Sequence, residues 1–150
     1  MHSTKPAGKE RIAYGKLPWV ALLAALVAAV ANALVYFAAS GLGFIPQTVL
    51  VPTPSGEHTL TMAPVVVSSV VGAIGAAIVF VIIGLFARRP VRLFRIVATV
   101  VLVLSFATPL TIPGTPAAMI LSLEVMPVVA WAVIVGLLTT MARQAKAASV

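Results

Sequence analysis

One acidic residue, Glu124, lies inside a long apolar stretch that runs from about residue 117 to residue 142. A carboxylate at the centre of a membrane-spanning helix costs about 2.5–3.5 kcal/mol, so such a group usually faces a partner or a cavity. Pro127 has no N–H to donate to the carbonyl of Leu123 and should kink a helix there. These residues predict a small polar cavity within the apolar part of the protein.

The other apolar stretches carry uncharged polar side chains at a similar distance from the same end. At a rise of about 1.5 Å per residue, these side chains and Glu124 fall in one layer of a helical bundle. Polar groups without partners are costly in lipid, so we expect them to converge inside the bundle. The candidate ligand- or proton-binding residues are Glu124, Asn32, Tyr36, Ser68, Ser69, Ser105 and Thr108.

Two interpretations of this layer stay open. In the first, an uncharged Glu124 donates a hydrogen bond to Asn32 or to a serine and only holds the helices together. In the second, the layer binds a small ligand or carries a proton. Proton transfer usually needs more than one titratable station, and the apolar stretches contain no second one.

Composition predicts the elements that position this layer. The chain of 150 residues is 61% hydrophobic and 9% charged, whereas soluble domains are about 45–50% apolar and about 25% charged. The sequence therefore predicts an all-α membrane protein, a bundle of four transmembrane helices over residues 17–142. A cleaved signal peptide is the alternative for the first stretch, which is longer than the usual apolar core of about 7–15 residues. The expected spans are about 17–39, 63–86, 94–112 and 117–142.

The longest connection, residues 41–62, contains two β-prone runs around a turn rich in proline and glycine. This pattern predicts a short β-hairpin between the first two helices. A lone hairpin is marginally stable in water, so it should pack on the helix ends.

The basic residues predict the orientation in the membrane. All ten Lys and Arg lie in the tail 1–16, in the turn before the third span, or in the tail 143–150. The positive-inside rule therefore places both termini in the cytoplasm and the hairpin outside. The turn residues expected to contact anionic lipid headgroups are Arg88, Arg89, Arg92 and Arg95. This distribution accounts for the net charge of +7 without nucleic acid.

The sequence offers little for catalysis. It has no cysteine, and its two histidines and three acidic residues are scattered along the chain. No catalytic motif, metal site or cofactor is therefore predicted, and the sequence favours a protein without enzymatic activity. An enzyme that acts on a lipid or quinone at the outer leaflet is the weakest of the functions considered.

Short motifs resemble a known family. Asn32 and Tyr36 lie late in the first span, Arg89-Pro90 precedes the third, and Ser105 and Pro109 lie near its end. With the glycine-rich second span and the hairpin, these motifs resemble a family of small four-helix bacterial membrane proteins of unknown function. The resemblance implies the fold and a bacterial plasma (inner) membrane, and it implies no activity.

Two functions follow from these patterns. Small residues four apart on the second span, such as Ser69, Ala73 and Ala77, allow close helix contact within the chain or with another chain. They favour a non-enzymatic accessory or scaffolding subunit of a larger membrane complex or a homo-oligomer. The alternative is a small transporter or ligand-binding protein that uses the polar layer around Glu124.

Overall fold

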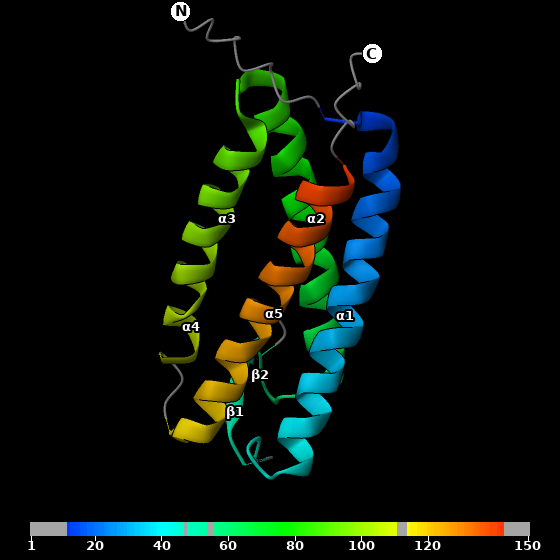
Figure 1. Ribbon diagram of the computed structural model, residues 1–150. Helices are drawn as coiled ribbons and strands as arrows, with labels where there is room; N and C mark the ends of the chain where they lie inside the picture. The colour runs from blue at the N-terminus through cyan, green and yellow to red at the C-terminus, as the bar shows by residue number, and fades with distance from the viewer. Residues whose placement is uncertain (1–11, 47, 54–55, 111–113, 143–150) are drawn as a thin grey trace, which may run out of the picture.

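The structure, a computed structural model, describes residues 12–46, 48–53, 56–110 and 114–142 and is mostly helical (Figure 1). Three of its helices are long and apolar enough to cross a membrane. In chain order the elements are η1 (Tyr14–Lys16), α1 (Leu17–Gly41), β1 (Leu50–Thr53), β2 (Gly56–Thr59), α2 (Met62–Phe86), α3 (Pro90–Ser105), α4 (Ala107–Leu110) and α5 (Ala117–Met141).

Helix α1 packs closely on α2 and on α5. Its buried residues are mostly alanines, including Ala24 and Ala28, and the facing side of α2 buries Ser69, Ala73 and Ala77. Small side chains let the helix backbones approach closely, which gives good packing where lipid supplies no hydrophobic driving force. Many large apolar side chains, such as Leu26 on α1, point outward from the bundle.

Helix α3 differs from the predicted third span of residues 94–112. It begins earlier, at Pro90, because proline has the backbone angle of a first helical turn and lacks an N–H that would go unpaired there. It ends at Ser105, and a short α4 follows. Pro109 has no N–H for the carbonyl of Ser105, which interrupts the regular helical hydrogen bonding.

The contacts of α3 with its neighbours are concentrated at its first turns. Its buried residues are Pro90, Val91 and Phe94. The ring of Phe94 packs on Phe80 of α2, with 4.8 Å between ring centroids. The Arg95 guanidinium donates a hydrogen bond of 3.2 Å to Thr139 Oγ1 on α5. The rest of α3 is less closely held.

Strands β1 and β2 pair antiparallel between α1 and α2, with Pro52 opposite Glu57. They lie nearer the turn than the β-prone runs of the sequence. Figure 1 shows them at the end of the bundle opposite the start of α1. The Tyr36 hydroxyl donates to the Leu60 carbonyl at 3.1 Å, which ties the connection to α1.

At the opposite end of the bundle, the residues just before α1 contact both α2 and the end of α5. The Ala13 N–H donates to the Ala142 carbonyl at 2.8 Å. A Cβ atom at Gly84 would lie 2.8 Å from Tyr14 Oη and would also clash with Ile12 Cδ1. Glycine at this position of α2 therefore leaves room for the segment before α1.

Candidate functional site

A cavity of about 800 Å³ lies between α2, α3 and α5, and it is open on one side, where Ser68 and Gly72 of its wall are exposed. Its volume is within the range of about 300–1,000 Å³ that is usual for small-molecule sites. On α2 its wall includes Ser68, Gly72 and Gly75, where a Cβ atom added at either glycine would meet nothing within 4 Å. Most of the lining is apolar, and the described lining residues include no acid, lysine, arginine or histidine.

Asn32 of α1 brings the most polar group to this cavity. Its side chain is only 4% exposed, and Nδ2 donates to Ser69 Oγ at 2.9 Å. Ser69 gives its single proton to the Val65 carbonyl at 2.8 Å, so it can only accept from Asn32. This chain of bonds orients the amide and leaves Asn32 Oδ1 buried without a partner in the described part of the protein.

Helix α5 brings two further polar groups. Trp131 lines the cavity, and its Nε1 is buried with no acceptor among the described residues. Leu123 and Pro127 also line it, and Pro127 cannot donate the N–H that the Leu123 carbonyl would receive in a regular helix. Buried polar groups without partners are few in folded proteins. Two of them belong to residues that line this cavity, which marks it as a candidate binding site.

The other uncharged residues of the predicted layer fall in different places. Ser68 and Ser105 line the cavity, but their hydroxyls donate to carbonyls of their own helices, at 3.0 and 2.7 Å. The Tyr36 hydroxyl bonds to Leu60 instead of facing Asn32. The side chain of Thr108 is outside the part of the chain that the structure describes. Among the described side chains of this layer, only Asn32 and Ser69 form a hydrogen bond between two helices.

Glu124 is half-buried and is not among the residues that line the cavity. The lining positions of α5, such as Leu123, Pro127 and Trp131, follow the spacing of one helix face. Glu124 follows Leu123 by one residue and precedes Trp131 by seven, about two helical turns, so it lies at the edge of this face of α5 without lining the cavity. Among the described residues its carboxylate has no hydrogen-bond or ion-pair partner.

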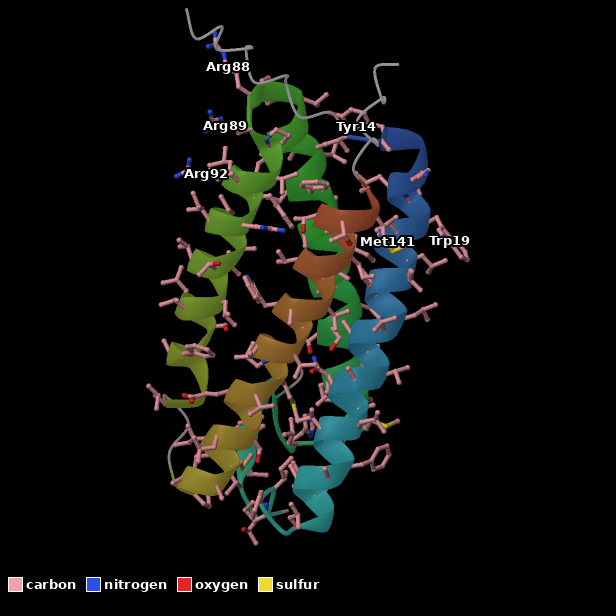
Figure 2. The ribbon with its side chains drawn as sticks, in the orientation of Figure 1. Tyr14, Trp19, Arg88, Arg89, Arg92 and Met141 are labelled. Atoms are coloured by element: carbon pink, nitrogen blue, oxygen red, sulfur yellow. The ribbon has the colours of Figure 1, made fainter. Side chains whose placement is uncertain are left out.

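Three arginines are exposed at the end of the bundle where α2 turns into α3. Figure 2 shows Arg88, Arg89 and Arg92 pointing outward there, while Tyr14, Trp19 and Met141 lie at the same end. Arg95 differs from them, because its guanidinium reaches across to the buried Thr139.

The sequence from residue 13 to residue 144 matches a family of unknown function, DUF6069. The chain belongs to this family. Membership of an uncharacterised family was predicted from the motifs around Asn32 and Arg89, and it is confirmed. No curated protein and no solved structure matches the chain. The DUF6069 family assigns no activity, so function has to be argued from the cavity.

Sequence reasoning missed Trp131 and Thr139. For Trp131 there was a signal, because tryptophans of membrane proteins gather at the ends of the spans, whereas Trp131 lies in the middle of an apolar run. No sequence pattern marks Thr139, because its hydrogen bond depends on the direction of the Arg95 side chain. In the described ranges no three histidine or carboxylate side chains lie together as a metal site requires.

Proposed function

We propose that this DUF6069 protein is a non-enzymatic integral membrane protein that binds a small lipid-like molecule between α2, α3 and α5. The observation that carries the proposal is the apolar cavity of about 800 Å³, two of whose lining residues, Asn32 and Trp131, each have a buried polar atom without a partner among the described residues. Small-molecule sites typically combine mostly apolar walls with a few placed polar groups. Transport of the bound molecule would need a second, open state.

The small-residue stripes of α2 support this function over an accessory subunit. The stripe of Ser69, Ala73 and Ala77 is buried within the chain, on the side of α2 that packs on α1. The parallel stripe that includes Ser68 and Gly72 lines the cavity. Both stripes thus have a use within one chain, and neither requires another subunit.

In this proposal α3 and α4 together form a fourth span beside α1, α2 and α5. All described Lys and Arg lie at one end of the bundle, and the connections at the other end contain none. This asymmetry supports cytoplasmic termini in a bacterial plasma membrane. Arg88, Arg89 and Arg92 would then contact anionic headgroups of the inner leaflet.

Native mass spectrometry after extraction in mild detergent tests the binding function. Gly72→Leu fills the cavity from α2 without a clash, because a Cβ atom there meets nothing within 4 Å. Gly136→Leu is the matched control, since Gly136 also has free space around its Cβ but does not line this cavity. We expect a bound small molecule on the wild type and on Gly136→Leu, and its loss from Gly72→Leu.

Two results would contradict the proposal. One is a wild-type protein that carries no small molecule, even after incubation with total membrane lipid. The other is a larger protein at fixed stoichiometry on the wild type that Gly72→Leu alone displaces, because the cavity would then be the seat of a partner helix and the accessory function would stand.

A further inference from the structure

The polar atoms of the cavity also indicate which class of molecule it accepts. We propose that the ligand is an uncharged amphiphile whose hydroxyl group donates a hydrogen bond to Asn32 Oδ1, as a long-chain or isoprenoid alcohol can. This inference rests on the proposed binding function and adds the chemistry of the headgroup.

The first step is that the ligand carries no charge. The described residues of the wall offer no ionised side chain that could pair with one. Moving an unpaired charge into such a place costs many times the free energy of one hydrogen bond. Anionic lipids and fatty acid anions are therefore excluded from the interior, although their headgroups suit the exposed Arg88, Arg89 and Arg92.

The second step is the type of polar group. Asn32 Oδ1 is an acceptor and needs a donor, whereas Trp131 Nε1 is a donor and needs an acceptor. An ionised carboxylate or phosphate diester only accepts, and a quaternary ammonium does neither. A hydroxyl both donates and accepts, so it suits either of the two unpartnered atoms. A hydrocarbon chain suits the rest of the wall.

The third step is that the Asn32 amide is already oriented by other residues of the protein. The bonds from Asn32 Nδ2 to Ser69 and from Ser69 to Val65 hold the amide in one orientation. A second partner for Oδ1 would complete the hydrogen bonding of this side chain, which is 4% exposed. Asn32 Oδ1 has almost no accessible surface, so a neighbouring side chain has to move aside before a ligand hydroxyl can reach it. That hydroxyl then removes the cost of a buried unpaired acceptor, so it gains affinity that a plain hydrocarbon lacks.

The two tryptophans make the test direct. Trp131 lines the cavity, whereas Trp19 is 65% exposed on the outside of α1. In Trp19→Phe the fluorescence comes from Trp131 alone, and in Trp131→Phe it comes from Trp19. Bromine atoms quench indole fluorescence at short range, so the probes are dibromo-octadecanol, dibromo-octadecane and ionised dibromostearic acid, each titrated into the purified full chain in detergent.

We expect saturable quenching of Trp131 by the dibrominated alcohol, reversed by unbrominated octadecanol. The hydrocarbon should need an about three- to tenfold higher concentration, as the loss of one hydrogen bond implies, and the acid at least about tenfold higher. In Trp131→Phe all three probes should quench Trp19 without saturation. Adding Asn32→Leu to Trp19→Phe should make alcohol and hydrocarbon equal. Asn32→Ala serves if that variant does not fold.

The outcomes separate the two proposals. Equal saturable quenching by alcohol and hydrocarbon, or an alcohol preference that survives the loss of Asn32, overturns the headgroup assignment and leaves the binding function intact. Binding of the ionised acid as tight as that of the alcohol overturns the exclusion of charge. Absence of saturable quenching by every probe overturns the binding function itself.

Discussion

Helix α2 carries two similar stripes of small residues that have different surroundings. One stripe packs on α1, and the other borders the cavity. On one side Ser69, Ala73 and Ala77 are buried on the face that packs on α1. On the other side Ser68 and Gly72 border the cavity. The two stripes are one residue apart in the sequence, so small side chains by themselves do not decide whether helices close on each other.

The difference depends on which helix faces each stripe of α2. α1 presents buried alanines such as Ala24 and Ala28 along its length, so its backbone can approach α2 closely. α3 carries large residues at its buried start, where Phe94 meets Phe80, and it has no fully buried residue after Phe94. A helix held at one end by an aromatic pair stays apart from its neighbours farther along, and this separation produces the cavity.

The largest expected effect comes from enlarging a residue on the closed side of α2. In Ala73→Leu the added atoms have no space, because Ala73 is fully buried. Overpacking of this kind costs about 1–3 kcal/mol. Thermal unfolding in mild detergent, followed by far-UV circular dichroism, should show a clear drop in Tm. An unchanged Tm would mean that α1 and α2 do not pack as closely as described.

A smaller loss of stability is expected when the hydrogen bond between Asn32 of α1 and Ser69 of α2 is removed. Ser69→Ala leaves the whole Asn32 amide unpaired in an apolar place and should cost about 1–2 kcal/mol. Asn32→Leu removes the unpaired Oδ1 together with the bond, so it should cost less than Ser69→Ala. The same unfolding measurement on the two variants gives the order, and the reverse order would contradict the unpaired state of Oδ1.

The sequence predicted that the small residues of α2 allow close helix contact and that Asn32 lies at the depth of the serines, but it did not predict which helix would be the partner. In the structure α1 is that partner, and Asn32 donates a hydrogen bond to Ser69. The cavity depends on the angle at which α3 leaves Phe94, and this angle has no local pattern. The position of Glu124 in the sequence does not show which face of α5 lines the cavity.

On the open side of α2, the same substitution should have the opposite sign. Gly72→Leu adds a side chain to free space and replaces a glycine within a helix, which gains up to about 1 kcal/mol. We expect Tm to stay level or to rise slightly, in contrast to Ala73→Leu at the next residue. A drop as large as that of Ala73→Leu would show that the cavity is closed in solution.

The smallest effect is expected at Glu124, which belongs to neither side. Its carboxylate has no partner in the described part of the chain, so the near-isosteric Glu124→Gln should change the free energy of unfolding by less than about 0.5 kcal/mol. The binding of dibromo-octadecanol to Trp19→Phe should also be unchanged when Glu124→Gln is added. A shift in either quantity would bring Glu124 back into the site.

The bond between Ala13 and Ala142 has a consequence for biosynthesis. It joins the residues just before the first helix to the residue just after the last one. The ribosome makes the first of these long before the second, so this bond forms only after α5 has been made, whereas Ile12 and Tyr14 can already lie over Gly84 of α2. Helices α1, α2 and α3 can associate earlier, and this end of the bundle closes last.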